Sequence, residues 1–429
     1  MSTSSAGPAM DTRMRDFRLL MVGRTLSLIG ASMTGLAVML LALELSGSAT
    51  IAGGVAAAIT LGGLLTALPA GALVDRLDRK RIMVVSAGTL AAALFSVPVA
   101  ALFGVVSLWH LVVVSFLVGA LATFYDPAET AAVKRLVAAD RLGVAVTVQQ
   151  VRGSIGNLVG GPLAGALFGL GRFVPLIGDA LANVVAAVLA GMVRTDLEPV
   201  SRTRSNVVKE AAEGISWLLK SPGPRTVALV SAVNMFGISC LMTGVTLGLR
   251  VSGQPAAVVG LVQTVLGAAL LVGSLLTPRI QRIASLGRIF LVSSALQVVL
   301  TFALLRARQP EAVFVVFGLL ALTGPPSPIS LRAWFMAATP DRLQGRATAA
   351  LGLVTIASAP LSTVLTGWLL EHAGRTSSLL PAVVASAVTL VAGLFSQTLR
   401  SLPRIDGLSA VADEAEAASG PVSRFGRGR

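Results

Sequence analysis

Long runs of apolar residues recur along almost the whole chain, and they constrain its fold more than any other feature. A helix needs roughly 20 predominantly apolar residues to cross the hydrocarbon core of a bilayer. The 429 residues are 54% hydrophobic and only 13% charged, and the mean hydropathy is +0.82. A water-soluble domain carries many more charges. The sequence therefore predicts an all-α membrane protein.

We expect twelve transmembrane helices, because twelve apolar segments of sufficient length can be marked out in the sequence. They cover residues 17–43, 50–74, 82–104, 107–126, 146–170, 173–193, 225–249, 255–278, 288–306, 311–334, 347–370 and 376–398. The first segment has no small-residue cleavage site with a polar stretch behind it, and another span follows soon. It is therefore predicted to be a retained helix and not a signal peptide.

The basic residues are distributed unevenly between the predicted loops on the two sides of the membrane. Alternate connections collect 26 Lys and Arg residues on one side of the predicted membrane and five on the other. Because cytoplasmic loops carry the excess of Lys and Arg, both termini are expected in the cytoplasm, which also supports an even number of helices. The net charge of +14 is thus a topological signal, and nucleic acid is not an expected partner.

Residues for catalysis or metal binding are sparse. Cys240 is the only cysteine, and His110 and His372 are far apart in the sequence. No Ser/His/Asp set, paired carboxylates or phosphate-binding glycine loop stands out. The sequence predicts no enzyme activity, no cofactor and no metal site.

A polar segment at residues 194–224 divides the chain into two parts of six predicted spans each. Its middle, NVVKEAAEGISWLL, has apolar positions at helical spacing, which predicts an amphipathic helix. The two parts resemble each other, because Asp140-Arg141-Leu142 and Asp341-Arg342-Leu343 occur at the same offset as Pro127 and Pro328. Two parallel six-helix repeats are a recurrent transporter design. The predicted organisation is a cytoplasmic tail (1–16), a six-helix bundle (17–193), a cytoplasmic linker (194–224), a second, pseudo-symmetric six-helix bundle (225–398) and a disordered cytoplasmic tail (399–429).

The stretch GALVDRLDRKR after the second predicted span resembles the loop motif of the major facilitator superfamily, Gly-x-x-x-Asp-Arg-x-Gly-Arg-Arg/Lys-Arg/Lys. The matching residues are Gly71, Asp75, Arg76, Arg79, Lys80 and Arg81, while Asp78 replaces a glycine. In that family the loop is a conformational latch between the two halves, and the natural partners for its arginines here are Asp126, Glu129 and Arg152. Asp75 can accept hydrogen bonds from a neighbouring helix N-terminus. The alternative is that these are solvated loop charges, which contribute little.

The fifth predicted span, IGNLVGGPLAGALFG, is similar to the family's antiporter motif Gly-x-x-x-Gly-Pro-x-x-Gly-Gly. Gly161, Pro162 and Gly165 match it, and Asn157 and Ala166 replace two glycines. Together with FRLL near the start and YDPA after the fourth span, this resemblance points to the bacterial branch of multidrug and secreted-metabolite exporters. It implies a plasma (inner) membrane protein that works by alternating access.

Few polar residues lie on the helices that line the substrate cavity in this family. The cavity candidates are Arg24, Phe124, Gln149, Gln150, Asn234, Gln263 and Trp334. Such an apolar lining suits a hydrophobic or amphipathic solute better than a sugar, whose hydroxyls would be left unpaired. Ionisable groups in a membrane span are costly and therefore candidates for proton coupling. They are Asp179, which could equally be a structural, hydrogen-bonded Asp, and Glu44, expected near the outer interface.

These features predict a secondary transporter that exports hydrophobic small molecules, with protons as the coupling ion, the lipid bilayer as its surroundings and a monomer as its state. Two alternatives remain open from the sequence. One is an uptake transporter for a small metabolite, and the other is a non-transporting membrane scaffold or sensor with the same fold.

Overall fold

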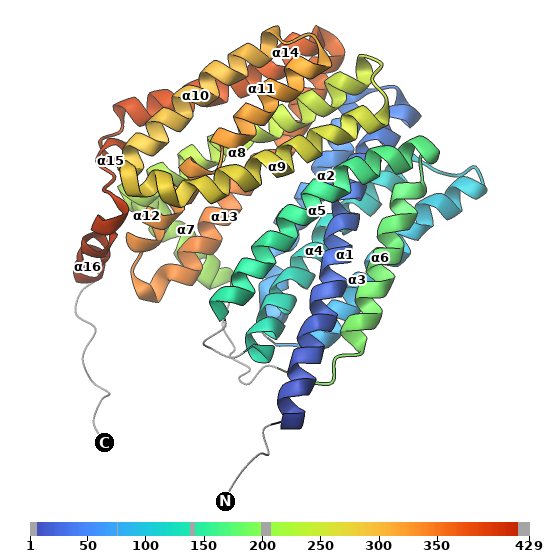
Figure 1. The fold of residues 1–429 in the computed structure, drawn as a ribbon, viewed down its shortest axis with the longest axis horizontal. Helices are drawn as coiled ribbons and strands as arrows, with labels where there is room; N and C mark the ends of the chain where they lie inside the picture. The colour runs from blue at the N-terminus through green and yellow to red at the C-terminus, as the bar shows by residue number, and fades with distance from the viewer. Residues whose placement is uncertain (1–6, 75, 138–141, 199–206, 419–429) are drawn as a thin grey trace, which may run out of the picture. The chain divides into compact units, whose positions relative to one another are not determined.

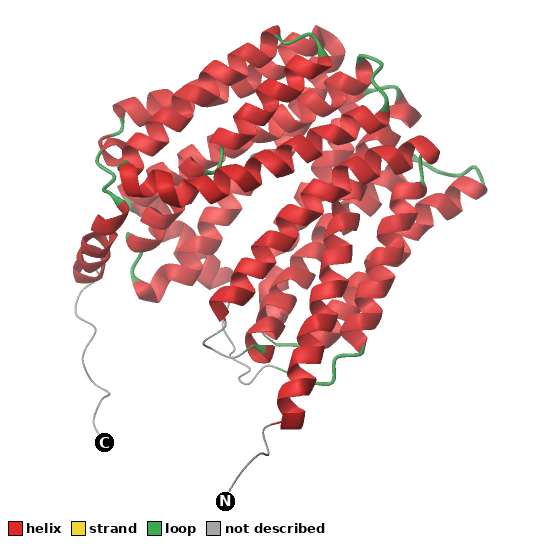
Figure 2. Cartoon of the chain, in the orientation of Figure 1, coloured by secondary structure: helices red, strands yellow, loops and turns green. Residues whose placement is uncertain are grey.

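The computed structural model describes residues 7–74, 76–137, 142–198 and 207–418, and every regular element in these ranges is a helix (Figure 2). Helices dominate because lipid offers no partner for a backbone N–H or C=O group, so each segment must satisfy its own. The α-helices are α1 (Gly7–Ser46), α2 (Ala49–Val74), α3 (Arg79–Leu102), α4 (Leu108–Leu136), α5 (Leu142–Leu170), α6 (Val174–Gly191), α7 (Val207–Lys220), α8 (Pro222–Val251), α9 (Ala256–Ile283), α10 (Leu286–Arg306), α11 (Pro310–Thr323), α12 (Pro326–Ala337), α13 (Gln344–Ala357), α14 (Ala359–Phe395), α15 (Gln397–Arg400) and α16 (Leu408–Ala418).

Ten helices of the described ranges are long and apolar enough to cross a membrane. One of these spans, Asp341–Phe395, is 55 residues long and contains a kink at Gly374, where φ is +80°. From α5, the search finds only a shorter apolar helix, Leu158–Leu170. The chain is therefore an all-helical, multi-pass membrane protein.

Prolines and glycines break two of the predicted helices. The span predicted at 311–334 consists of α11 and α12, which are separated at Gly324 and Pro325. The span predicted at 347–370 is divided between α13 and α14 at Ser358. Proline has no N–H for the helical ladder and clashes with the preceding turn, so each break lies just before a proline.

Two predicted helix ends are wrong. The first span was expected to begin at residue 17, but α1 begins at Gly7. The fourth span was expected to end at residue 126, but α4 continues through Pro127 to Leu136. Asp126 and Glu129, expected at the end of this helix, therefore lie well inside it. In the C-terminal tail, where no regular structure is predicted, the Ala- and Glu-rich segment LSAVADEAEAA forms α16, consistent with the high helix propensity of both residue types.

The described residues form two compact units. The first consists of Met1–Val207, Ser239–Ala268 and Ala359–Ser378, and the second of Val208–Ile238, Ala269–Ser358 and Leu379–Arg429. In the first unit α1 packs against α5 and α6, α2 packs against α4, and α3 packs against α4 and α6 (Figure 1). Every helix from α1 to α6 thus has a neighbour in this unit that is distant in sequence.

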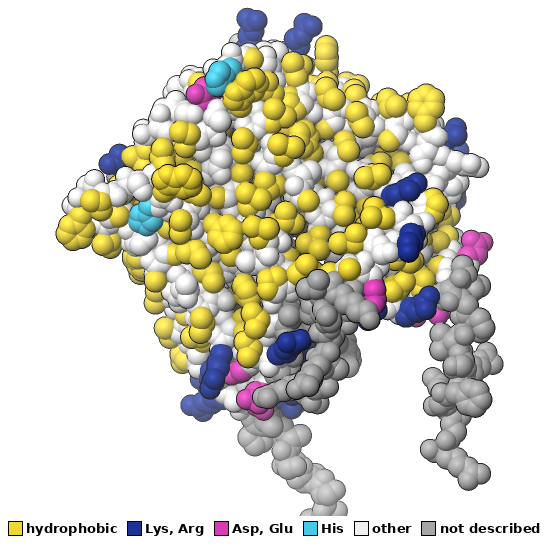
Figure 3. Space-filling view, turned by 180° about the vertical axis from the view of Figure 1, so that it is seen from behind, with side chains coloured by type: hydrophobic (Ala, Val, Ile, Leu, Met, Phe, Trp, Pro, Cys, Tyr) yellow, Lys and Arg dark blue, Asp and Glu magenta, His cyan; other side chains and the backbone are white. Residues whose placement is uncertain are grey.

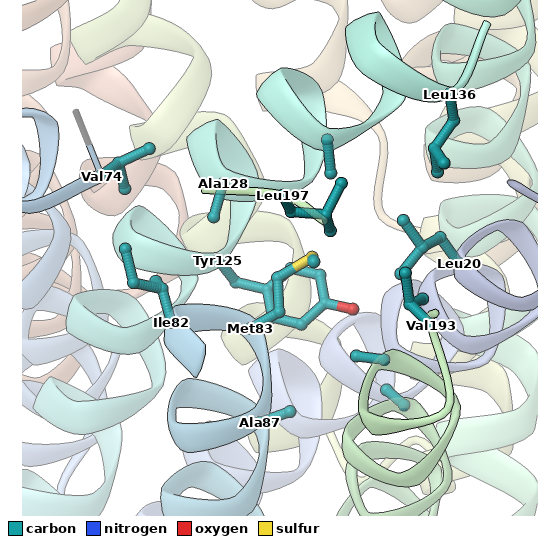
Figure 4. Packing of buried hydrophobic residues seen from close by; sticks show 13 residues of the cluster. Leu20, Val74, Ile82, Met83, Ala87, Tyr125, Ala128, Leu136, Val193 and Leu197 are labelled. Carbon is teal, nitrogen blue, oxygen red and sulfur yellow. The ribbon is translucent and has the colours of Figure 1, made fainter. Parts of the chain in front are cut away.

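A hydrophobic cluster lies among α1, α3, α4 and the segment after α6 in the first unit. Figure 4 shows Tyr125 of α4 next to Met83 of α3, with Leu20 of α1 and Val193 close by. Met83 is fully buried and Tyr125 is 4% exposed. This packing fixes the part of α4 that carries the acidic residues described below.

The second unit contains the predicted amphipathic helix, which the structure confirms as α7. Leu218 of α7 is buried in a cluster with Phe290 of α10 and Phe335 of α12. Trp217 makes an edge-to-face contact with Phe335, with ring centroids 6.2 Å apart. The apolar face of α7 therefore packs on protein in this unit.

The surface is largely apolar. Figure 3 shows hydrophobic side chains spread over the visible face, with the few Lys and Arg side chains towards its margins. Val85, Val113 and Val299 are each more than half exposed. A soluble protein rarely exposes so wide an apolar surface, whereas lipid covers it without cost.

Candidate functional site

Helix α4 carries two acidic side chains into the first unit. Asp126 and Glu129 are three positions apart and so share one helical face. Arg24 of α1 forms an ion pair with Asp126, and its Nε lies 3.4 Å from Glu129 Oε2. Arg152 of α5 has a guanidinium nitrogen 2.8 Å from Glu129 Oε1. These four residues from three helices are called the charge cluster below.

The charge cluster is buried at one side and open at the other. The side chains of Arg24, Glu129 and Arg152 are 11%, 5% and 7% exposed, whereas that of Asp126 is 55% exposed. Two positive and two negative groups balance formally, which a buried cluster requires, because an unpaired buried charge costs several kcal/mol. The Arg24 guanidinium also lies over the Tyr125 ring, 5.0 Å from its centroid. Removing one member would leave another charge without compensation.

A chain of hydrogen bonds connects the charge cluster to Asp179 of α6. Arg24 donates to Ser27 Oγ at 3.5 Å, and Ser27 donates to Asn183 Oδ1 at 3.1 Å. Asn183 Nδ2 in turn donates to Asp179 Oδ1 at 2.7 Å. The other carboxylate oxygen accepts a hydrogen bond from the Thr34 hydroxyl at 2.6 Å. The charge cluster and this chain of hydrogen bonds together are called the buried network below. Glu129 lies near one end of it and Asp179 at the other.

Gly30 of α1 leaves the room that the Asp179 carboxylate occupies. A Cβ at this position would lie 2.1 Å from Asp179 Oδ1 and 3.0 Å from its Cα. We expect Gly30→Ala to lower the stability by about 1–3 kcal/mol, the usual cost of overpacking. Gly35→Ala is the matched control on the same helix, because a Cβ there meets nothing within 4 Å. Thermal unfolding in detergent measures both, and equal melting temperatures would contradict the tight fit at Gly30.

The predicted latch loop is only partly described, since Asp75 lies outside the described residues. Asp78, which replaces the family's glycine, is the N-cap of α3 and accepts a hydrogen bond from the Lys80 backbone N–H at 2.9 Å. Its presence is therefore explained by helix capping. Lys80 Nζ donates to the Val193 carbonyl at 2.8 Å, and Arg79 donates to a carbonyl of the same segment after α6. The other predicted latch residues are Gly71 in α2, Arg76 after it and Arg81 in α3.

Asp126 and Arg152 have other partners than the sequence suggested. The acids Asp126 and Glu129, together with Arg152, were expected to be partners of the latch-loop arginines. In the structure Asp126 pairs with Arg24, and Glu129 pairs with Arg24 and Arg152. The physical reason is the length of α4, which keeps both acids on a helix that faces α1 and α5. Arg24, expected to line a substrate cavity, is a member of the charge cluster.

The antiporter-like motif of α5 makes a close helix crossing inside the first unit. A Cβ at Gly161 would lie 2.1 Å from Gln263 Cβ of α9, and one at Gly165 would lie 2.4 Å from the Ala256 carbonyl. In return, a Cβ at Gly260 would lie 2.5 Å from the Gly161 carbonyl. Small residues allow two backbones to approach in this way. Pro162 lies between the two glycines, inside α5.

The remaining cavity candidates have separate surroundings. Phe124 packs against the hydrophobic cluster of the first unit. In the second unit, Asn234 of α8 donates to Gln297 of α10 at 3.1 Å, and Trp334 packs against the core around Phe335. The side chains of Gln149 and Gln150 lie outside what the structure describes.

Glu44, the second proton-coupling candidate, lies near the end of α1. Its carboxylate forms an ion pair with Arg250 of α8 at 2.7 Å, and both side chains are about one-third exposed (30% and 28%). The pair lies within the first unit.

The sequence did not predict that Glu129 is buried between two arginines. The segment YDPAET contains two acids at the i, i+3 spacing of one helical face, next to an aromatic residue. That spacing was available in the sequence, but Pro127 favoured a helix end there. Ser27 and Thr34 carried no signal, because an isolated hydroxyl in an apolar helix usually bonds to its own backbone.

Comparison with known proteins agrees with this architecture. Residues 20–225 match the family model described as Major Facilitator Superfamily. "Multidrug efflux pump Tap" of Mycolicibacterium fortuitum is 26% identical over 376 residues, 84% of this chain and 91% of that protein. "Macrolide efflux protein A" of Streptococcus pyogenes is 27% identical over 230 residues, which are 51% of this chain. The chain spans about half of that relative, 55% of its length.

Solved structures show the same fold. A point mutant of the nucleoside transporter NupG superposes with a TM-score of 0.71 at 12% identity, covering 90% of this chain and 100% of that one. A bacterial homologue of the iron transporter ferroportin, in an inward-facing state, gives 0.71 at 16% identity and covers 90% and 99%. These identities bear on the fold alone. With its helical membrane fold and a family model that matches residues 20–225, the chain is similar to the major facilitator superfamily over about its N-terminal half.

Proposed function

We propose that the chain is a secondary transporter of the major facilitator superfamily, which exports hydrophobic or amphipathic small molecules by alternating access, in exchange for protons. Its proposed place is a bacterial plasma (inner) membrane, with twelve spans and both termini in the cytoplasm. The kink at Gly374 divides α14 into two helices, and α5 adds a further crossing to the helices counted as spans. The bundles at 17–193 and 225–398 are then the two halves that move, joined by the linker at 194–224.

The observation that carries proton exchange is the buried network of the first unit. Glu129 lies between Arg24 and Arg152 and is 5% exposed, so its charge is held almost entirely by these two partners. A proton on Glu129 would neutralise the carboxylate and weaken both ion pairs. Arg24 would then be held by Asp126 alone. Proton binding thereby changes the contacts among α1, α4 and α5, which a coupled transporter needs.

Asp179 is the second carboxylate of the network. It is fully buried and bonded to Thr34 and Asn183. Intramembrane carboxylates of this kind form proton relays in pumps and transporters. We assign Asp179 the role of a second proton position that communicates with Glu129 through Asn183 and Ser27.

Export is favoured over uptake by the relatives and by α5. The matched proteins are named for macrolide and multidrug efflux. The α5 glycines also give the close helix crossing that the antiporter-like motif suggested. A bulky apolar solute fits a protein whose membrane helices carry few polar side chains, since a sugar would leave its hydroxyls unpaired.

Proteoliposomes with an imposed proton gradient test this function. We expect the wild-type protein to move a macrolide or a hydrophobic dye against the direction of proton flow. Asp179→Asn should retain binding of the probe but lose gradient-driven accumulation, because the amide cannot carry the proton. Asp406→Asn, at an exposed position, is the control.

Each alternative has its own result in the same vesicles. Movement of solute and proton in one direction would indicate uptake, and the absence of any flux would indicate a scaffold. Undiminished coupling in Asp179→Asn would remove Asp179 from the mechanism. Proton movement and solute movement are recorded together, so that an uncoupled leak is distinguished from exchange.

A further inference from the structure

A carboxylate from far along the chain caps the beginning of α2. Glu371 of α14 accepts three hydrogen bonds at its Oε2: from the Ser48 hydroxyl at 2.6 Å, the Thr50 hydroxyl at 2.6 Å and the Thr50 backbone N–H at 2.9 Å. More than 300 residues separate the partners, yet both belong to the first unit. The contact therefore ties a late segment of the chain to the N-terminal helices.

The chemistry of this contact is that of a helix cap supplied by another helix. The first N–H groups of a helix have no intrahelical acceptor, and the helix dipole favours a negative charge there. The first turn of α2 has no acidic residue of its own. Glu371 thus provides the anion that the start of α2 lacks, and hydrogen bonds to a charged acceptor are about twice as strong as neutral ones.

The backbones beside this cap are in direct contact. A Cβ at Gly53 of α2 would lie 2.4 Å from the Thr363 carbonyl, and one at Gly367 of α14 would lie 2.3 Å from the Ala49 carbonyl. The later residue of α2 meets the earlier residue of α14, so the two segments run antiparallel. Neither glycine accepts a side chain while this contact is closed.

A second charged contact occurs on the same predicted side. Glu44, near the end of α1, pairs with Arg250, near the end of α8. The loop after α1 and the loop after α8 are among those with few basic residues, which places both on the predicted extracellular side. This contact is a single ion pair, whereas the exposed Glu371 accepts three hydrogen bonds.

We propose that Glu371 is the acid of an extracellular latch, which holds the start of α2 against α14 and breaks when the transporter opens outward. The proposal rests on the alternating access proposed above. It makes α2 a helix with a latch at each end, since Asp75 directly follows its last residue, Val74. Asp75 would then hold the transporter closed on the cytoplasmic side in one state. Glu371 would hold it closed on the extracellular side in the other.

Cysteine labelling tests the latch without any substrate. The background is Cys240→Ala, which removes the one cysteine, and the probe is Ala49→Cys, because Ala49 is buried in the contact at 4% exposure. A membrane-impermeant maleimide is applied from outside to whole cells. In this background Glu371→Gln should raise the labelling rate about tenfold, the effect of losing charge-assisted hydrogen bonds. Glu44→Gln should give a smaller rise, because its ion pair joins α1 to α8 and not α2 to α14.

The matched control is Glu311→Gln. Glu311 is an acid in the first turn of its own helix, α11, on the same predicted side. Its neutralisation should leave labelling at the reference rate. Equal labelling in the Glu371→Gln and Glu311→Gln proteins would overturn the latch.

A second variant keeps the test valid if Glu371→Gln folds poorly. In the Cys240→Ala background, Thr50→Cys and Glu371→Cys are joined by a short reducible thiol cross-linker. Cross-linking should stop efflux, and reduction should restore it. Continued efflux by the cross-linked protein would refute the latch, because the contact would then not need to open. A change in labelling in a protein that exports no solute would support the latch and contradict the proposed export function. The two proposals can therefore fail separately.

Discussion

Replacing Glu129 by Gln should abolish proton-coupled efflux and destabilise the protein by roughly 3–5 kcal/mol, the typical cost of breaking a buried ion pair. The amide has nearly the same volume, so packing is not the cause. The loss arises because Arg152 and Arg24 remain buried with only Asp126, which is 55% exposed, to balance them. Efflux in proteoliposomes and chemical or thermal unfolding in detergent measure the two effects.

A compensating variant separates stability from coupling. Glu129→Gln combined with Arg152→Gln removes one charge of each sign, and it should recover most of the lost stability while efflux stays uncoupled. Glu213→Gln is the control, because it breaks an ion pair with Arg346 whose side chains are 42% and 37% exposed. Exposed pairs contribute about 1 kcal/mol or less. Restored coupling in the double variant would show that Glu129 carries no proton.

Replacing Gly161 by Leu should reduce both the rate of efflux and the stability of the protein. The first side-chain carbon alone would lie 2.1 Å from Gln263 Cβ and 2.9 Å from the Gly260 carbonyl. Because a Cβ is fixed to the backbone, no rotamer relieves the contact, and α5 must move away from α9. Overpacking of this kind costs about 1–3 kcal/mol, and more where the backbone cannot shift.

The same helix provides a matched control for this prediction. A Cβ at Gly169 of α5 would meet nothing within 4 Å. Gly169→Leu should therefore leave both melting temperature and efflux near the wild-type values. Gly260→Ala, on the other side of the crossing, should behave like a mild form of Gly161→Leu. If Gly161→Leu and Gly169→Leu transport equally, the close crossing of α5 and α9 has no part in the transport cycle.

Much of the fold followed from hydropathy. The positions of α2, α3, α6 and α10 agree with the predicted spans to within a few residues, because a helix in lipid must be apolar over a fixed length. Prolines had no uniform effect, since Pro69 and Pro98 lie inside the well-predicted α2 and α3. The same residue type lies inside α4 at Pro127 and follows the break at Ser358, as Pro360. Its local effect depends on which neighbouring helices pack there, and the sequence does not state those neighbours.

The site was predicted less well than the fold. Asp179 and Asn183 were expected on one helical face, and the structure joins them directly. Glu129 was expected to assist a loop, yet it lies between two arginines from α1 and α5. Arg24 and Asp126 are more than 100 residues apart in the chain. A contact over such a separation leaves no periodic signal in a single sequence.

By itself, the sequence determined that this chain is a helical membrane protein and that it resembles the major facilitator superfamily, because hydrophobic length and a loop motif are local properties. Only the tertiary structure decided which charges share a site. The ion pairs of Glu129, the fit of Gly30 to Asp179 and the cap of α2 by Glu371 each join residues from different helices. A buried charge is tolerated only where another helix brings its partner, and that meeting is set by packing.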